Sequence, residues 1–481
     1  MAEKRNLRRF EQYQDSIGRY LSAKRSIEGE LDSSYIEINA QNSQSNLVKT
    51  ITFQVTDNCN LRCTYCYQIN KGKRVMDFET AKKFIDLLIE ESYDKNSYVA
   101  IEKTPGIVVE FIGGEPLLEI ELIDKITDYF RYRLIKEHHP WASKILFSMI
   151  SNGVLYFEPK VQDYIKKNNR RLSFGISLDG CKELHDMCRV FPDGLGSYDI
   201  AEAGCIHYKK NYNDKMLTKM TIAPENVTWV FDAFKNLVDL KYPTIHANCV
   251  YEKGWTVNHA IVLYDQLKKV ADYLLENDLE NEIICTILDE FSCLPQMESD
   301  NDNYCGSTGC MLSCDPDGVI APCIRFLKSS LGEKVGDFAL GHINSGIGKE
   351  ECHKCNICTL DSITRKSQST NECWRCPISL GCGWCTAYNY QELGTPDARC
   401  TYICWTHRAR ALANVYYWNK VYQKNNENKV FPLYLQKEYA LQLISEEEYD
   451  MLLELAQGKG ELTEEELDAF IKRNPNNPKE G

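Results

Sequence analysis

Between Thr50 and about Leu288, short runs of β-branched and apolar residues alternate with longer amphipathic stretches. In one stretch the apolar residues recur at three- and four-residue spacing from Phe78 to Leu88, which predicts one buried face of a helix capped by Asp77. The strand-like runs are ITFQVT from Ile51, IVVEFI from Ile107, ILFSMI from Ile145, LSFGISL from Leu172, LTKMTI from Leu217, TIHANCV from Thr244 and EIICTIL from Glu282.

This order of strand, helix and strand, repeated six times, predicts an α/β fold with a parallel sheet and right-handed crossovers, long enough for a partial or complete barrel. Loops that follow parallel strands gather at one edge of the sheet, where ligands bind. Here those loops carry unusual residues, so we expect a binding site at that edge. They are CNLRCTYC after the first strand, GGEP (113–116) after the second, SNG (151–153) after the third and DG (179–180) after the fourth.

Changes in composition divide the chain into four predicted regions. Residues 1–50 form a charged helix and a polar linker, and residues 51–290 form the alternating region. Residues 291–407 are rich in Cys, Gly and Asp, with a hairpin signal at DPDG (315–318), which predicts a small domain held together by metal. Residues 408–481 form a helical extension with an acidic tail.

Composition and charge exclude several classes of protein. The chain has 481 residues, of which 43% are hydrophobic and 26% charged, and no apolar run approaches the ~18 residues of a membrane span. The net charge of -13 disfavours binding to the phosphate backbone of a nucleic acid, so we expect neither a nucleic acid nor a membrane as partner. The start, MAEKRNLRRF, lacks the apolar core of a signal peptide, which predicts a cytoplasmic protein.

The 22 cysteines are clustered. Thirteen lie between Cys305 and Cys404, and three more lie at Cys59, Cys63 and Cys66. Thiols stay reduced in the cytosol, so such clusters indicate metal rather than disulfides.

The spacing Cys59-x3-Cys63-x2-Cys66 offers three thiolates, and the next cysteine is Cys181. Structural zinc and ferredoxin clusters both use four ligands, so a cubane on three cysteines leaves one iron open to a cofactor. The alternative is a zinc site completed by a distant His or Cys.

The motif Cys-x3-Cys-x-aromatic-Cys, with Tyr65 as the aromatic residue, resembles the signature of the radical S-adenosylmethionine (radical SAM) superfamily, and the resemblance extends from Thr52 to about Leu288. It implies a partial (β/α)6 barrel and a [4Fe-4S] cluster that cleaves S-adenosylmethionine to a 5'-deoxyadenosyl radical. In that family the GGE segment binds the amine of the cofactor. For Arg189, a surface ion pair is the alternative role. The resemblance assigns to the cofactor Tyr65, Gly113, Gly114, Glu115, Ser151, Asn152, Ser177 and Arg189.

The later cysteines resemble the SPASM extension of radical SAM peptide-modifying enzymes, which implies two auxiliary [4Fe-4S] clusters. The familiar pattern has three residues before the cysteine matched by Cys385, and this chain has two. Cys400 competes with Cys404 as the last ligand, and we favour Cys404 because TYICWTHRARAL is similar to the segment in which the family's final cysteine enters a helix. The implied sets are Cys305, Cys310, Cys323 and Cys385 for one cluster, and Cys373, Cys376, Cys382 and Cys404 for the other.

Several cysteines remain outside these sets. Cys352, Cys355 and Cys358 have metal-like spacing without a fourth ligand, so they hold zinc, a further cluster or nothing, and Cys314 is also unassigned. The isolated cysteines are predicted to be ordinary buried residues, namely Cys181, Cys188, Cys205, Cys249, Cys285 and Cys293.

The resemblance is strongest to maturases of ribosomal peptides that join a Cys sulfur to carbon (sactipeptide and ranthipeptide types), with GCGWCTAYNYQELGTP and ALANVYYWNKVY as the similar segments. It implies a precursor peptide with a leader and a Cys-containing core, and an electron donor such as flavodoxin or ferredoxin. Residues 1–50 are too short for a complete leader-binding module, so the leader docks there, on the C-terminal helices or on another protein.

Three alternatives stay open. Anaerobic sulfatase-maturating enzymes, which make formylglycine, typically have Asp directly after the cysteine matched by Cys323, where this chain has Ile324. Peptide epimerases and carbon-carbon cross-linking maturases share every motif. A non-catalytic adaptor protein, held together by zinc and binding a partner, would need neither GGEP nor an open iron. The sequence identifies no catalytic base.

Overall fold

The computed structural model describes residues 48–473 except positions 215, 217, 302, 304 and 333. The helix and linker predicted for residues 1–50 therefore lie outside the described residues, apart from the three that begin the first strand, and so does the leader-docking site expected there.

Two parallel sheets form the α/β region, with all seven predicted strands at their predicted places. In the larger sheet β1 (Val48–Thr56), β2 (Gly106–Gly113), β3 (Ile145–Ser151) and β4 (Leu172–Ile176) pair in sequence order. The smaller sheet consists of β5 (Thr218–Ile222), β6 (Thr244–Cys249) and β7 (Ile284–Cys285). The predicted α/β class with a parallel sheet is confirmed.

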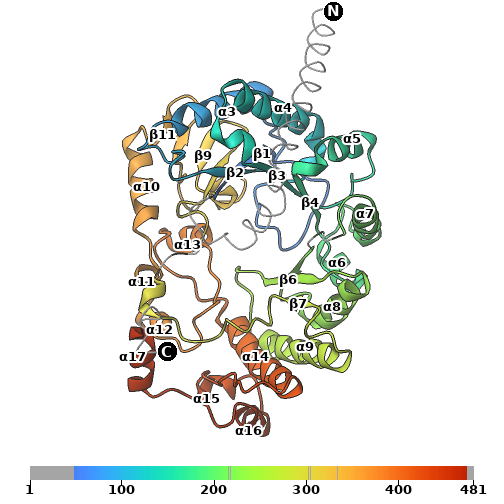
Figure 1. Ribbon diagram of the computed structural model, residues 1–481, viewed down its shortest axis with the longest axis vertical. Helices are drawn as coiled ribbons and strands as arrows, with labels where there is room; N and C mark the ends of the chain where they lie inside the picture. The colour runs from blue at the N-terminus through green and yellow to red at the C-terminus, as the bar shows by residue number, and fades with distance from the viewer. Residues whose placement is uncertain are drawn as a thin grey trace, which may run out of the picture.

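Helices connect these strands and cover the outer faces of the sheets (Figure 1). They are α3 (Phe78–Ser92), α4 (Ile120–Lys136), α5 (Pro159–Asn168), α6 (Lys182–Cys188), α7 (Tyr198–Asn211), α8 (Val230–Asp239) and α9 (Val257–Glu276). Short 3-10 turns lie at η1 (Pro116–Glu119), η2 (Pro140–Ser143), η3 (Asn169–Arg171), η4 (Val227–Trp229), η5 (Glu298–Asp300) and η6 (Ile324–Phe326).

Helix α3 forms as its apolar spacing predicts. Asp77 Oδ1 accepts a hydrogen bond from the backbone N of Thr80 at 2.6 Å, which satisfies one of the free N–H groups of the first turn. Phe84 and Leu88 are buried, and the ring of Phe84 lies 5.1 Å from that of Phe53 on β1. The helix is therefore fixed on the sheet by its apolar face.

The cysteine-rich region continues the larger sheet. Strand β8 (Met311–Cys314) pairs in parallel with β1 through Thr50–Phe53, and β9 (Val319–Ala321), β10 (Gly341–His342) and β11 (Gly346–Ile347) follow in antiparallel order. The hairpin predicted at 315–318 joins β8 to β9, with Gly318 at a φ of +85°, where glycine is favoured. The boundary predicted near residue 290 thus separates two regions of sequence that share one sheet.

The remaining helices run from the cysteine-rich region to the C-terminal end. They are α10 (Glu351–Ser362), α11 (Arg365–Gln368), α12 (Asn371–Trp374), α13 (Thr386–Leu393), α14 (Cys404–Lys424), α15 (Lys437–Ala440), α16 (Glu446–Leu455) and α17 (Glu464–Lys472). Helix α14 lies against α9, where Tyr416 donates a hydrogen bond of 2.6 Å to Asp272 (Figure 1).

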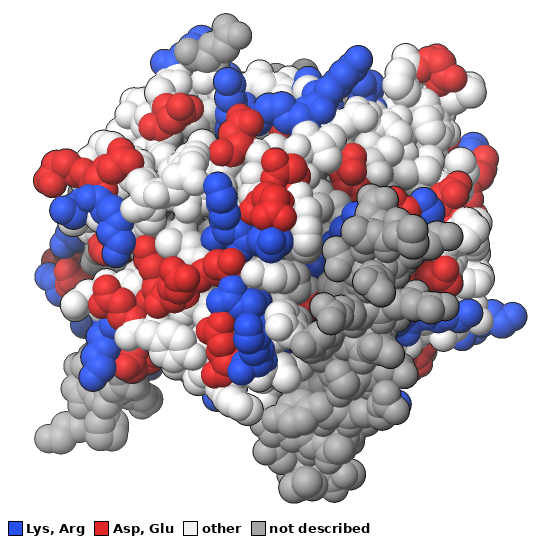
Figure 2. Space-filling view, turned by 90° about the horizontal axis from the view of Figure 1, so that it is seen from above, with Lys and Arg blue, Asp and Glu red and all other residues white. Residues whose placement is uncertain are grey.

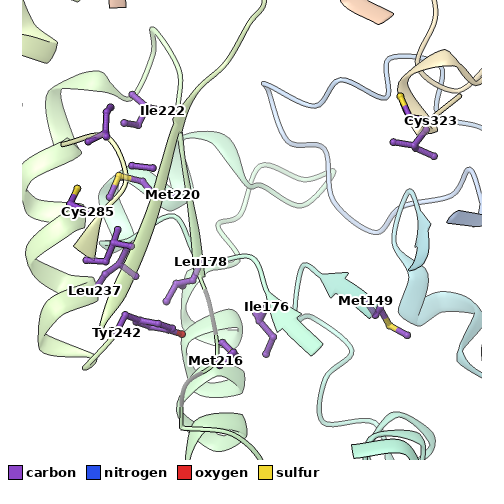
Figure 3. Close-up of a cluster of buried hydrophobic side chains, with 14 of the residues drawn as sticks. Met149, Ile176, Leu178, Met216, Met220, Ile222, Leu237, Tyr242, Cys285 and Cys323 are labelled. Atoms are coloured by element: carbon purple, nitrogen blue, oxygen red, sulfur yellow. The ribbon is translucent and has the colours of Figure 1, made fainter. Parts of the chain in front are cut away.

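Behind the smaller sheet lies a core of apolar side chains. In Figure 3, Met220 of β5, Leu237 of α8 and Cys285 of β7 lie together, and Cys323 lies apart on the other side of the view. Five of the six cysteines predicted to be ordinary core residues are buried, and Cys249 is half-buried.

The described residues show no membrane-crossing helix, since every helix among them is too short or too polar to span a bilayer. On the face seen in Figure 2, acidic and basic side chains are interspersed.

Candidate active site

The three-cysteine motif lies in the loop after β1. Backbone hydrogen bonds from Arg62 N to Val190 O (2.7 Å) and from Thr64 N to Cys188 O (3.0 Å) fix this loop on the end of α6 and the residues that follow it. Cys59 is buried, and burial raises the pKa of its thiol to about 11. Metal binding therefore requires the ion itself to stabilise the thiolate.

The Gly-Gly pair after β2 packs directly on the start of this loop. Gly114 N donates to Thr56 O at 2.9 Å, and Glu115 N donates to Asn58 O at 2.8 Å. A Cβ atom on Gly114 would lie 2.2 Å from Asn58 O, and one on Gly113 would lie 2.6 Å from Thr56 O. Only glycine permits this close approach, so GGE sets the position of the loop that carries the cysteines.

Glu115 joins three of the predicted loops from a fully buried position. Its Oε1 accepts hydrogen bonds from Ser151 Oγ (2.7 Å) and Leu117 N (3.0 Å), and its Oε2 accepts from Asn152 N (2.8 Å). Burial raises the pKa of this carboxyl group, and the three hydrogen bonds oppose that rise. Both carboxylate oxygens accept hydrogen bonds from protein donors, so Glu115 holds the loops after β2 and β3 together.

The predicted residues of the third and fourth loops join the same edge of the sheet. Asn152 Nδ2 donates to Asn60 Oδ1 at 2.7 Å, and Ser177 N donates to Ser151 O at 2.8 Å. The Nδ2 atom of Asn60 is buried without a hydrogen-bond partner, so it is a free donor within the cysteine loop.

Asp179 was not predicted as a site residue, although its DG loop was. It accepts from Arg189 Nε at 2.8 Å, from Thr221 N at 3.1 Å and from the hydroxyl of Tyr65. Burial raises its pKa, but the charges of Arg189 and His185 and the hydrogen bonds outweigh burial, and the net pKa is lowered. The Arg189 side chain is only 13% exposed, so the alternative of a surface ion pair is not what the structure contains.

The structure brings the first implied auxiliary set together. Cys305 Sγ lies 3.1 Å from Thr386 Oγ1, next to Cys385 in the chain. Burial raises the pKa of Cys323, and the nearby charges of Cys385 and Cys305 raise it further. Burial likewise raises the pKa of Cys310, where Lys49 opposes and Cys305 reinforces the shift.

The second implied set lines a cavity of about 720 Å³ beneath α14. Burial raises the pKa of Cys376 to about 12, and the charges of Cys382, Cys404 and Cys373 contribute to the shift. Cys400 also lines this cavity, but its own pKa shift comes from burial and from Glu392 and includes Cys385 rather than the members of this set. The ligand role of all eight cysteines stays a prediction.

The spacing of the thiols bears on the zinc alternative. A tetrahedral zinc with Zn–S bonds of about 2.3 Å holds its sulfurs about 3.8 Å apart. Among the described residues, the group of metal-ligating atoms that lie within 4.8 Å of one another is Glu350, Cys352 and His353, which belongs to none of the three predicted sets. Within the part of the chain that the structure describes, none of the three predicted sets brings three sulfurs within 4.8 Å of one another.

The structure places Cys352, Cys355 and Cys358, for which the spacing leaves zinc, a further cluster or nothing open, on one helix. All three are exposed on the single helix α10. Six residues of helix separate Cys352 from Cys358 by about 9 Å along the axis, too far for one ion to bind both.

A cavity of about 220 Å³ lies between the first cysteine loop and the auxiliary region. Cys66 and Tyr67 line one side, and Arg325 and Tyr388 line the other. Arg325 lies 4.4 Å from the centre of the Tyr67 ring and donates to Glu252 Oε1 at 2.9 Å.

The sequence did not predict either member of this ion pair as a site residue. Glu252 follows β6, and its Oε2 atom is buried without a hydrogen-bond partner. The available signal was position in the sequence, because Glu252 lies two residues after a predicted strand and Arg325 lies two residues after Cys323.

Comparison with known families identifies this edge of the sheet. Residues 53–267 match the radical SAM superfamily, which covers the three cysteines, GGE and the DG loop. Residues 53–267 of this chain therefore form a radical SAM domain.

Three curated relatives extend the comparison. The protein MJ0907 of Methanocaldococcus jannaschii, of unassigned function, is 31% identical over 40% of this chain, which spans 59% of that relative. The radical SAM cyclopropyl synthase TigE of Paramaledivibacter caminithermalis is 25% identical over 70% of this chain and 67% of its own length. A cysteine-type anaerobic sulfatase-maturating enzyme of Clostridium perfringens is 26% identical over 55% of this chain and 71% of its own.

A solved structure shows the same fold. Native anSMEcpe with bound AdoMet and the Cp18Cys peptide superposes with a TM-score of 0.55 and 18% identity, covering 79% of this chain and 99% of that one.

Proposed function

We propose that this enzyme modifies a ribosomally made peptide, and that the modification is an oxidative thioether link from a Cys sulfur to a carbon atom. The observation that supports the proposal is the cavity between the loop of Cys66 and the segment of Arg325, since it offers room for a substrate beside the first cysteine loop. Relatives that mature sulfatases or form cyclopropyl groups support a radical reaction on a peptide.

The residues present fit the cofactors that this class uses. Three thiols without a closing ligand suit a [4Fe-4S] cluster that leaves one iron for S-adenosylmethionine. The free Nδ2 of Asn60 offers a hydrogen-bond donor to that cofactor. When bound, S-adenosylmethionine supplies the radical that removes a hydrogen atom from the substrate carbon, and a flavodoxin or ferredoxin is the proposed electron donor.

The protein must also accept what the cross-link releases. Joining a thiol sulfur to carbon removes one hydrogen atom from the carbon, one proton from the thiol and one electron. We assign the proton to Glu252, because this residue lines the cavity, Arg325 holds its Oε1, and its Oε2 has no hydrogen-bond partner. The set with Cys323 and Cys385 lies behind Arg325, where an auxiliary cluster would take the electron.

Formylglycine formation is the second candidate, since a sulfatase-maturating enzyme is among the relatives. The residue directly after Cys323 is Ile324, which has no proton-accepting group. The proposal therefore assigns the acid-base role to Glu252, which follows β6.

The products distinguish the candidates. Reduced holoenzyme with S-adenosylmethionine is incubated with synthetic Cys-containing peptides, and the product is alkylated and sequenced by mass spectrometry. We expect the loss of two hydrogens and of one alkylatable thiol, with a fragment in which sulfur bridges two residues. Loss of sulfur with gain of oxygen would instead establish formylglycine, and loss of two hydrogens with every thiol still reactive would establish a carbon-carbon link.

A further inference from the structure

Helix α10 carries a group of metal-ligating atoms outside every cysteine set assigned above. The ligand atoms of Glu350, Cys352 and His353 lie within 4.8 Å of one another at the start of this helix. Thiolate, imidazole and carboxylate are the three ligand types that proteins use for zinc.

His353 occupies a position where the helix is expected to bury an apolar residue. The inner face of α10 is formed by residues 353, 357 and 360, with Leu360 buried in the core and Ile357 packed against it. Asn356 Nδ2 donates to Ala339 O at 2.8 Å and holds the helix in place. His353 is 8% exposed, and its Nδ1 atom is buried without a hydrogen-bond partner. A buried ring nitrogen left without a partner is costly, so it indicates a missing ligand.

The other two side chains are free to bind. Glu350 precedes the helix but makes no capping hydrogen bond with its side chain. The neighbouring lysines face other carboxylates, Lys349 towards Glu91 at 3.6 Å and Lys354 towards Glu351 at 3.8 Å. Cys352 is an exposed free thiol.

We propose that Glu350, Cys352 and His353 form a binding site for one zinc ion, with water as the fourth ligand. The ion, one thiolate, one carboxylate and a neutral imidazole sum to zero charge, so the positive end of the helix dipole does not oppose binding. A bound zinc ion would link the exposed side chains of Glu350 and Cys352 to His353, which is buried on the inner face of α10. It is independent of the radical chemistry, because no member belongs to the three cysteine sets.

The test uses reconstituted holoenzyme that is stripped with a chelating resin, given one equivalent of Zn²⁺ and gel-filtered. Zinc and iron are counted by mass spectrometry, and the zinc environment is measured by X-ray absorption at the zinc edge, where iron does not interfere. We expect one zinc ion per chain, bound by one sulfur and otherwise by nitrogen and oxygen.

Two exposed ligands provide variants that leave the core intact. Cys352→Ser and Glu350→Gln should each weaken zinc binding by at least about tenfold, while the iron content stays that of the wild type. Cys358→Ser is the matched control, since it removes an exposed thiol from the same helix and should retain the zinc. A zinc environment of four sulfurs, or undiminished binding by Cys352→Ser, would overturn the proposal.

Discussion

The hydroxyl of Ser151 donates a hydrogen bond of 2.7 Å to Glu115 Oε1, and this contact joins the loops after β2 and β3 at the site. The same carboxylate accepts from Asn152 N, and the backbone N of Glu115 is bonded to Asn58 of the cysteine loop. Three loops far apart in sequence are thus held by one buried acid.

Cys66→Ala should abolish cleavage of S-adenosylmethionine, because two thiolates do not hold the predicted cluster with its open iron. The measurement is 5'-deoxyadenosine released after reduction with dithionite. Cys205→Ala is the control, since Cys205 is a buried cysteine outside the sets and should retain most of the activity. Cleavage by Cys66→Ala at the wild-type rate would remove this residue from the site.

Cys376→Ala should separate cleavage from product formation. Cys376 lines the cavity of the second auxiliary set, away from the first cysteine loop, so deoxyadenosine should still form while cross-linked peptide falls at least about tenfold. Both products are quantified in one reaction by mass spectrometry. Full yield of modified peptide would show that a cluster at this set is dispensable.

Asp179→Asn should destabilise the protein by about 3–5 kcal/mol, because it leaves the largely buried Arg189 without its charged partner. Urea unfolding of the unreconstituted protein measures this directly. Lys182→Ala, which removes an exposed ion pair with Asp199 nearby, should change the free energy of unfolding by less than about 1 kcal/mol. Equal effects of the two substitutions would contradict the role given to Asp179.

The same carboxyl group predicts a pH dependence. Its pKa is lowered in the folded protein below the ordinary value of 3.8, so its stabilising effect is present above about pH 4 and is lost as pH falls through the folded pKa. The stability gap between wild type and Asp179→Asn should therefore be constant near pH 7 and narrow below pH 4. A stability difference between wild type and Asp179→Asn that grows below pH 4 would contradict a lowered pKa of Asp179.

Gly114→Ala should disrupt the cysteine loop, since the new Cβ would lie 2.2 Å from Asn58 O and the backbone must move. We expect binding of S-adenosylmethionine, measured by equilibrium dialysis on the reconstituted enzyme, to weaken by at least about tenfold, or about 1.4 kcal/mol. Gly332→Ala adds a methyl group with its nearest neighbour at 3.7 Å and should bind normally. Unchanged affinity in Gly114→Ala would show that the loop position does not matter for the cofactor.

The strands and the loops that follow them could be predicted because their signals are local. The seven apolar runs lie at strand positions, and GGE, SNG and DG fall at the ends of β2, β3 and β4, where parallel topology gathers them. Long-range pairing left no such local signal. Nothing in the residues around Met311 indicated that β8 would pair with β1.

The polar connections of the site were also beyond the sequence pattern. Asp179 and Arg189 are charged residues ten positions apart that resemble any surface pair until burial is known. Arg325 and Glu252 are 73 positions apart and meet only because the cysteine-rich region folds back over the end of β6. The proposed zinc site depends on the buried face of α10, which the spacing of Cys352, Cys355 and Cys358 did not reveal.

The most direct test of the account is electron paramagnetic resonance of the anaerobically reconstituted and reduced protein, with and without S-adenosylmethionine. If Cys59, Cys63 and Cys66 hold a cluster with one open iron, the cofactor should shift the signal of one reduced [4Fe-4S] cluster in the wild type and produce no shift in Cys66→Ala. A spectrum that the cofactor leaves unchanged in the wild type, or protein that binds zinc in place of iron at these cysteines, would contradict the account.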